Sequence, residues 1–426
     1  MMNKKLSPET GRAALRALIK EGSPLGPLKV MAKHVGRFFQ IPIPGFRPYV
    51  VFGPEANRKV LVTERDKVLW RNTDPVTDLL GRGVLIVDGE EHDHYRKLME
   101  PPLHPSKLPN YTQMMIAQTD RVASTWQDGE TVDMLVESRK IALLIIVQTL
   151  FSKDAWDDLP LIWTPILKAI EYISPGLWII WRKMPRIGFK KHLKVLDDYL
   201  YRIIADRRMG TFEQDLLQHL IDAGLTDNVI RDQMLTMLIA GHDTSTALLA
   251  WTFALLGQHA DVHARVVNEV DSQEKSALLD QVIKESLRLY PPIHIGNRRV
   301  AKEMEFSEGN VPPNERMFYS IYLTHRDPEI WENAEDFCPE RFAHGRKTPP
   351  FSYVPFGGGP RACIGGAFGQ AEARIVMSRL LQTYKFEFTN HKIHAHMGAT
   401  LEPRPGVRMK ISKRAPAAVP GGEDAA

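Results

Sequence analysis

One stretch near the C-terminus constrains the fold more than any other: residues 356–369 read F-G-G-G-P-R-A-C-I-G-G-A-F-G. Three consecutive glycines followed by a proline exclude a regular helix or strand, so the stretch forms a loop that lies close to its partner. Cys363 ends the loop, and apolar residues then recur at helical spacing. Because free backbone N–H groups and the helix dipole favour negative charge, a thiol at a helix start is biased towards the thiolate. With Arg361 as a nearby cation, the stretch predicts a sulfur anion beside a flat, anionic partner rather than a merely buried cysteine.

The rest of the chain has the composition of one globular protein. It has 426 residues, of which 43% are hydrophobic and 25% charged, and its prolines and glycines are scattered without a linker or repeat. We expect a single domain over residues 1–426, with a lead-in segment at 1–27 and a disordered tail at 412–426. A chain of this length can bury a core large enough to enclose a cofactor.

Charge and cysteine content exclude several classes of function. A net charge of +4 over this length is too small to indicate nucleic-acid binding. The only cysteines are Cys338 and Cys363, too few for a disulfide framework, a four-cysteine zinc site or an iron–sulfur cluster. Residues 1–19 lack the apolar core of a signal peptide or membrane anchor. We therefore expect a cytoplasmic protein without a transmembrane anchor.

The longest helical pattern in the chain has poor helix formers at its centre. It opens at Thr226, a suitable N-cap, and runs to about Gly257. Its middle, residues 238–247, reads L-I-A-G-H-D-T-S-T-A, in which glycine, aspartate, serine and threonine all weaken a helix. Departures of this kind are expected at functional sites, although a glycine kink that serves packing is the alternative.

These two stretches resemble the motifs of the cytochrome P450 family. The haem-binding signature F-x-x-G-x-R-x-C-x-G is matched at Phe356, Gly359, Arg361, Cys363 and Gly365. The resemblance implies a mainly α fold with small β-sheets, in which haem b lies between the long central helix and the cysteine loop with its helix. It implies that Cys363 is the axial ligand of the haem iron, with Phe356 beside the sulfur side of the ring and Gly365 also in contact with the cofactor.

The oxygen-activation motif of the family, A/G-G-x-D/E-T-T/S, is matched by residues 240–245. The resemblance implies that Thr244 hydrogen-bonds the bound dioxygen and that Asp243 connects this network to solvent for proton delivery. It implies further that Gly241 lets the backbone approach the bound oxygen. The catalytic residues that it assigns are Ala240, Gly241, Asp243 and Thr244.

A second charged segment suits the carboxylates of haem. Residues 88–96 read D-G-E-E-H-D-H-Y-R, and His92 and Arg96, four apart, share one face of a helix. By itself the pattern fits an exposed, charged helix start better, but the family carries a similar pair that contacts the haem propionates. The residues that the resemblance assigns to the propionates are His92, Arg96, Arg299 and Arg361. Arg298 is an alternative to Arg299.

A buried charge cluster is implied by two further motifs. Glu285 and Arg288 lie three apart in a helical segment, and Arg341 follows in the sequence P-E-R-F. In the family such residues form a buried triad in which two guanidinium groups bind one carboxylate. Exposed helix charges are the alternative interpretation.

The resemblance implies a monooxygenase that inserts one atom of O2 into an apolar small molecule. No G-x-G-x-x-G in a strand–helix setting and no cysteine cluster occurs in the sequence. We therefore expect electrons from NAD(P)H to arrive through a separate ferredoxin or flavodoxin with its reductase, and we expect a monomer. A peroxide-driven peroxygenase and a non-catalytic haem-thiolate binding or sensor protein are the alternatives. The apolar region 172–181 fits either helix packing or contact with a membrane surface.

Overall fold

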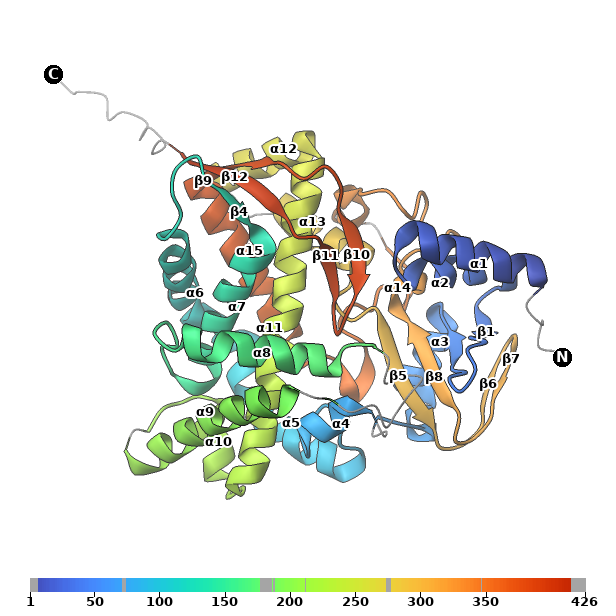
Figure 1. Cartoon of the computed structure of the whole chain (residues 1–426), viewed down its shortest axis with the longest axis horizontal. Helices are drawn as coiled ribbons and strands as arrows, with labels where there is room; N and C mark the ends of the chain where they lie inside the picture. The colour runs from blue at the N-terminus through green and yellow to red at the C-terminus, as the bar shows by residue number, and fades with distance from the viewer. Residues whose placement is uncertain are drawn as a thin grey trace.

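The fold is mainly helical, as a computed structural model of the chain shows (Figure 1). The structure describes residues 7–70, 74–176, 186, 188–210, 212–272, 277–345 and 347–414. Its α-helices are α1 (Pro8–Glu21), α2 (Leu25–Val35), α3 (Pro54–Arg58), α4 (Pro75–Leu80), α5 (Gly89–Leu103), α6 (Leu108–Ala123), α7 (Met134–Phe151), α8 (Leu159–Ile173), α9 (Phe189–Met209), α10 (Leu216–Asp222), α11 (Asp227–Gln258), α12 (Ala260–Asp271), α13 (Ala277–Leu289), α14 (Ile321–Thr324) and α15 (Gly366–Thr383).

The β-structure is divided among four small sheets. The largest has the strand order β1 (Phe38–Gln40), β2 (Tyr49–Val51), β8 (Arg316–Ser320), β5 (Ile295–Val300) and β3 (Val68–Leu69). A second joins β4 (Thr131–Asp133), β12 (Arg408–Lys413) and β9 (Tyr384–Phe388), and two hairpins pair β6 (Met304–Phe306) with β7 (Gly309–Val311) and β10 (His394–Met397) with β11 (Leu401–Arg404). Mainly helical structure with small sheets is the predicted fold class.

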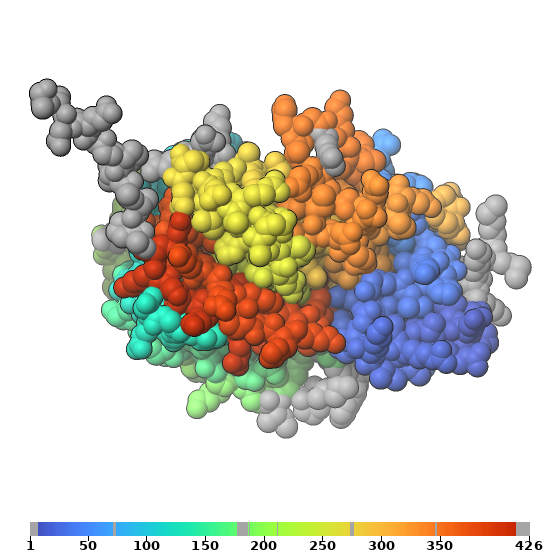
Figure 2. All heavy atoms as spheres, turned by 90° about the horizontal axis from the view of Figure 1, so that it is seen from above, coloured from blue at the N-terminus to red at the C-terminus, as the bar shows by residue number. Residues whose placement is uncertain are grey.

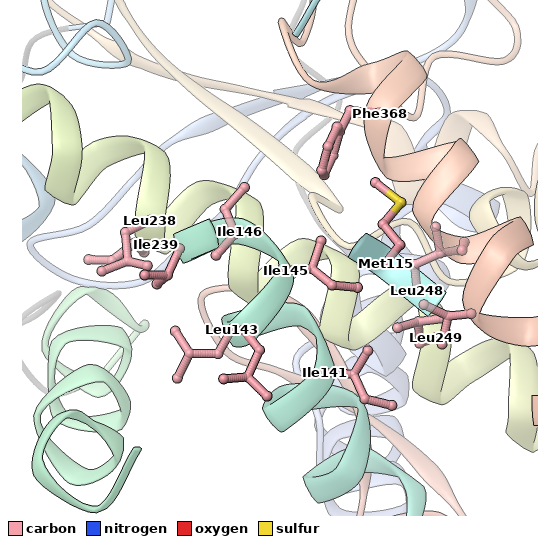
Figure 3. Close-up of a cluster of buried hydrophobic side chains, with 14 of the residues drawn as sticks. Met115, Ile141, Leu143, Ile145, Ile146, Leu238, Ile239, Leu248, Leu249 and Phe368 are labelled. Carbon is pink, nitrogen blue, oxygen red and sulfur yellow. The ribbon is translucent and has the colours of Figure 1, made fainter. Parts of the chain in front are cut away.

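Helix α11 organises the helical part of the molecule. It has 32 residues, follows the predicted N-cap Thr226 and is buried along most of its length. Helix α7 lies against it, and Figure 3 shows Ile141, Ile145 and Ile146 of α7 among the apolar side chains of this core. Both helices are apolar on nearly every face, which is the pattern of a helix enclosed by others rather than of a surface helix. The centre of α11 is therefore shielded from bulk solvent.

The predicted lead-in segment is helical, and the predicted tail begins within a strand. Residues 8–21 and 25–35 form α1 and α2, and Leu25 and Leu28 of α2 pack in one apolar cluster with Leu401 of β11. Figure 2 shows the same proximity, with the red C-terminal part against the blue N-terminal part. The chain remains ordered in β12 as far as Lys413, and 415–426 lie outside the described residues. Early apolar residues thus complete the core beside the large sheet.

No helix in the described parts of the chain is both long and apolar enough to cross a membrane. Helix α8 ends at Ile173, so the apolar region 172–181 begins at its last turn. Residues 177–181 of that region lie outside the described residues.

Candidate active site

The cysteine loop has a backbone that only glycine can follow at two points. Gly357 and Gly359 have φ angles of +69° and +64°, in the left-handed region. A Cβ atom on Gly359 would lie 2.3 Å from the carbonyl oxygen of Leu61, so the loop also passes too close to the π-helical turn at 59–63 for a side chain. The amide of Cys363 donates to the carbonyl of Phe356 over 2.8 Å, which closes the loop before α15 begins.

The Cys363 side chain is accessible although many protein atoms surround it. Burial is the largest influence on the thiol and raises its pKa. The backbone N–H of Gly365 and the charge of Arg96 act in the opposite direction. The cation beside the sulfur is therefore Arg96 and not the predicted Arg361, because the Arg361 guanidinium turns away to the Val87 carbonyl and the Asp88 carboxylate.

A short strip of α11 is open in the same way. Ala240, Gly241 and Thr244 are partly exposed, whereas nearly all other residues in the middle of the helix are buried. The Thr244 hydroxyl donates to the Ala240 carbonyl over 2.7 Å. One residue further along, the Ser245 hydroxyl donates to the Glu372 carboxyl of α15 over 2.6 Å. Because α15 starts directly after the cysteine loop, this bond brings the two predicted motifs to one region of the molecule.

Gly241 allows close packing of α7 on α11. A Cβ atom at this position would lie 2.7 Å from Cδ1 of Ile146 in α7. This contact supports the packing role considered as the alternative, and the approach of the backbone to bound oxygen stays a prediction.

Asp243 lies on the buried side of α11, where its two oxygens have separate partners. Oδ1 accepts from Arg139 of α7 over 3.1 Å, and Oδ2 accepts from the Thr400 hydroxyl over 2.8 Å. Only 2% of Asp243 is exposed, so the predicted connection to solvent would run through its partners rather than through Asp243 itself. Burial raises the pKa of Asp243, while the Arg139 charge and the Thr400 hydrogen bond oppose that rise. Arg139 also donates to Glu402, a second buried carboxylate.

Three guanidinium groups gather near the loop. Arg361 interacts electrostatically with Arg298, and desolvation lowers its pKa to about 10, partly offset by Asp88. Arg96 donates to the Ala362 carbonyl over 2.6 Å. The Arg298 guanidinium lies 3.6 Å from the ring centroid of Trp70, and Arg361 lies 5.6 Å from it. Arg361 is paired with Asp88 and Arg96 with Glu100, whereas Arg298 makes no bond to a carboxylate in the described residues, so its buried guanidinium suits an anionic ligand.

The strand that carries Arg298 settles which of the two neighbouring arginines faces this cluster. Side chains alternate across β5, and the buried residue is Arg298, whereas Arg299 is exposed. The prediction of Arg299 is therefore corrected to Arg298. His92 lies on the inner face of α5, as expected, and its Nδ1 lies 2.9 Å from a carboxylate oxygen of Asp93. Burial lowers the pKa of His92, which leaves a neutral ring at neutral pH.

Glu285, Arg288 and Arg341 lie together. Arg288 binds Glu285 through two bonds of 2.7 and 2.8 Å, and both side chains are fully buried. Arg341 Nε lies 3.4 Å from Glu285 Oε1. The remaining Arg288 bonds reach the backbone carbonyls of residues 325, 334 and 336. The cluster thus ties α13 to the segment that precedes the cysteine loop.

The comparisons with known proteins agree with this arrangement of thiol, cations and threonine. A family-wide pattern described as Cytochrome P450 matches residues 17–407, which places the chain among haem-containing oxygenases. The chain belongs to the cytochrome P450 family, and membership implies haem as its cofactor.

Named relatives narrow this further. Pentalenene oxygenase of Streptomyces avermitilis is 28% identical, over 85% of this chain and 86% of that protein. Cyclooctat-9-en-7-ol 5-monooxygenase of Streptomyces melanosporofaciens is 28% identical, over 80% of each chain. A solved structure, cyanobacterial CYP120A1 with bound retinoic acid, has a TM-score of 0.81 and 26% identity over 91% of this chain and 94% of that chain. The predicted P450 fold is confirmed, and the chain is a cytochrome P450 monooxygenase.

The residues present fit haem on three observations of this structure. The Cys363 thiol is accessible inside the protein, as an axial ligand must be. Arg96, Arg298 and Arg361 form a cationic cluster, which suits the two propionates. Trp70 Nε1 lies beside that cluster and is buried without a hydrogen-bond acceptor in the described residues. Buried donors are normally paired, so this N–H can bind an anionic ligand.

Sequence reasoning did not find Trp70, Arg139, Glu372, Thr400 or Glu402. Each makes its contact with a residue far away in the sequence, as when Arg139 meets Asp243, 104 residues later. A local signal was weak, because Arg139 stands among Glu137, Ser138 and Lys140 before the apolar part of α7 begins. A charged residue inside a buried helix requires a partner, but the sequence does not say which.

Proposed function

We propose that this monooxygenase inserts one atom of O2 into an apolar organic substrate, with electrons from NAD(P)H delivered by a separate ferredoxin or flavodoxin and its reductase. The observation that carries the proposal is the open strip of α11 at Ala240, Gly241 and Thr244, together with the accessible thiol of Cys363. Haem, when bound, supplies the chemistry of dioxygen activation. The chain supplies the ligand, the anchors and the protons, and we expect it to act as a monomer.

Each residue has a separate task in this proposal. Cys363 ligates the iron, and Gly365 donates its backbone N–H towards the sulfur, which moderates the negative charge there. Phe356 packs against Gly366, where a Cβ atom would lie 3.3 Å from the aromatic ring, and it shields the sulfur side of the cofactor. His92, Arg96, Arg298 and Arg361 hold the propionates, with Trp70 Nε1 as an additional donor.

The distal residues handle oxygen and protons. Thr244 places its hydroxyl in the open strip, where it can donate a hydrogen bond to bound dioxygen when it leaves the Ala240 carbonyl. Asp243, one residue away, is the proton source. Because burial raises its pKa, this carboxyl holds a proton more readily at neutral pH than an exposed aspartate does.

An apolar substrate is supported by two observations. Ala240 and Gly241 contribute no polar side chain to the open strip of α11. The names of two relatives and of the structural neighbour point to pentalenene, cyclooctat-9-en-7-ol and retinoic acid, which are hydrocarbon-rich molecules.

The two cysteines of this sequence are too few for an iron–sulfur cluster, which supports electron supply from another protein.

The test is turnover with a surrogate ferredoxin and reductase. Hydrocarbon-rich compounds are first screened for a shift of the haem Soret band, and those that bind are incubated with NADH, the surrogate pair and labelled O2. We expect one labelled oxygen atom in the product. Equal activity with hydrogen peroxide alone would show a peroxygenase, and ligand binding without turnover in either system would show a binding or sensor protein.

A further inference from the structure

One guanidinium in this molecule is shared by two buried carboxylates. Arg139 donates through Nη1 to Asp243 of α11 and through Nη2 to Glu402 of β11. All three residues are less than 8% exposed. Glu402 has a second cation, because Arg404 Nη2 donates to its other oxygen over 2.9 Å, and the Arg404 side chain is 47% exposed. A chain of charges therefore leads from Asp243 to the surface.

Asp243 is withdrawn in this arrangement. Its two oxygens are bound by Arg139 and Thr400, whereas Thr244 directs its hydroxyl to the Ala240 carbonyl. To deliver a proton towards Thr244, the Asp243 side chain has to leave both partners. If Arg139 had no other carboxylate, that movement would strand a buried charge, which is strongly unfavourable. Glu402 removes this obstacle, because Arg139 keeps an acidic partner while Asp243 is away.

Hydrogen bonds attach the hairpin that carries Thr400 and Glu402 to α11 and to two other segments of the chain. Trp251 of α11 donates through Nε1 to the Leu401 carbonyl over 2.8 Å, and the Leu401 amide donates to the Pro292 carbonyl over 3.0 Å. The amide of Ala399, at the tip of the hairpin, donates to Oγ of Ser174, directly after α8, over 3.0 Å. These bonds fix the hairpin, and with it Thr400 and Glu402, relative to α11.

We propose that Glu402 is a positioning residue that retains Arg139 while Asp243 moves to donate its proton, and that Thr400 holds Asp243 in the withdrawn position. The inference rests on the proton-donor role of Asp243 in the proposed function. In the step, the protonated Asp243 carboxyl gives its proton to the acceptor beside Thr244. The resulting carboxylate returns to Arg139, and solvent then protonates it again.

The sharing of Arg139 is tested by unfolding of the holoprotein, without turnover. Asp243→Asn and Glu402→Gln each leave Arg139 one carboxylate, so we expect each to lower the thermal midpoint by only about 1 °C at a fixed scan rate. The double variant leaves Arg139 without an acid, and its midpoint should fall by about 5 °C. A double variant whose loss equals the sum of the single losses would overturn the sharing of Arg139.

The positioning roles are tested by opposite effects on one rate. With the surrogate ferredoxin and reductase, Glu402→Gln should slow NADH oxidation about tenfold and raise its H2O/D2O ratio, because Arg139 then holds Asp243 more firmly. Thr400→Val keeps the shape of the side chain but releases Asp243 Oδ2, so the rate should stay the same or rise. A decrease of similar size in both variants would mean that the hairpin is merely structural and would overturn the proposal.

Asp215→Asn is the matched control for a buried ion pair. Asp215, at the N-terminus of α10, binds Arg207 of α9 through two bonds of 2.7 and 2.6 Å. Both side chains are buried. This variant should lose stability while its NADH oxidation and isotope ratio remain those of the wild type. A wild-type protein that does not oxidise NADH at all would contradict the proposed function instead. The thermal midpoints of the single and double variants would still show whether Asp243 and Glu402 share Arg139.

Discussion

Two buried charge clusters in this molecule are built from the same side chains in different proportions. In the cluster of Glu285, Arg288 and Arg341, two guanidinium groups meet one carboxylate, and every Arg288 nitrogen has a partner. Glu285 also accepts from the Cys338 amide over 2.9 Å. Because Glu285 is the one carboxylate of this cluster, its loss would strand the buried Arg288, so this pair is fixed.

In the cluster of Arg139, Asp243 and Glu402, two buried carboxylates share one buried guanidinium, and the partly exposed Arg404 is a second cation for Glu402. Asp243 can leave while Arg139 keeps Glu402, which is the movement that we propose. The two clusters therefore differ in whether the buried guanidinium has one carboxylate or two. Two further sites extend the range: Arg298 makes no bond to a carboxylate in the described residues, and the rise in the pKa of the buried Glu372 is opposed by the Ser245 hydroxyl.

The largest effect should come from breaking the fixed cluster. Glu285→Ala leaves Arg288 buried without its carboxylate, and the loss of about 3–5 kcal/mol should prevent recovery of folded holoprotein. The measurement is the ratio of haem absorbance to protein after purification. The control is Glu340→Ala in the same P-E-R-F segment, where an exposed pair with Arg265 is worth at most about 1 kcal/mol. A normal haem ratio in Glu285→Ala would show that this cluster is not required.

The second effect concerns Thr244 in the open strip of α11, next to Asp243. Thr244→Ala removes the hydroxyl that we place beside bound dioxygen, and product formed per NADH should fall about tenfold while hydrogen peroxide rises. Thr246→Ala is the matched control, because the Thr246 hydroxyl also bonds back along α11, to the His242 carbonyl over 2.8 Å, but is fully buried. Equal uncoupling in the two variants would contradict a special role for Thr244.

The third effect tests Arg298 in the cluster that we assign to the haem propionates. Arg298→Gln removes a buried cation beside Trp70, and a charge-assisted hydrogen bond worth about 1.5–3 kcal/mol should be lost from a propionate. Transfer of haem to excess apomyoglobin should become about tenfold faster or more. The neighbouring exposed residue provides the control, since Arg299→Gln should leave the transfer rate unchanged. The opposite ranking would restore the original assignment to Arg299.

The parts of the site that could be predicted from the sequence are those whose residues lie close together in one short segment. The turns at Gly357 and Gly359 need glycine, and Glu285 and Arg288 share a helix face at a spacing of three. Local physics fixes both features, so the loop, the long helix and the charged pair could be predicted. The fold class followed from the same motifs.

The direction in which a side chain faces was harder to predict than its presence. Asp243 was expected to link the site to solvent, and its own side chain is buried against Arg139 and Thr400, which lie 104 and 157 residues away in the sequence. Arg298 and Arg299 are neighbours with opposite faces, and only the packing of β5 against β8 shows which face is buried. Such choices depend on tertiary contacts that no local pattern contains.

The smallest effect tests the acid that has no guanidinium partner. Glu372 is fully buried, and desolvation raises its pKa to about 8 from 4.5, opposed only by the Ser245 hydrogen bond. Between those values the folded state holds a proton that the unfolded state has released, so stability falls as pH rises. From pH 6 to 7 the wild type should lose about 1.4 kcal/mol relative to Glu372→Gln, which carries no titrating group. Buried histidines contribute equally to both proteins and cancel in this difference. Urea unfolding of the two proteins at both pH values measures it, and a difference that does not change with pH would mean that a cation neutralises Glu372 and that it belongs with the paired clusters.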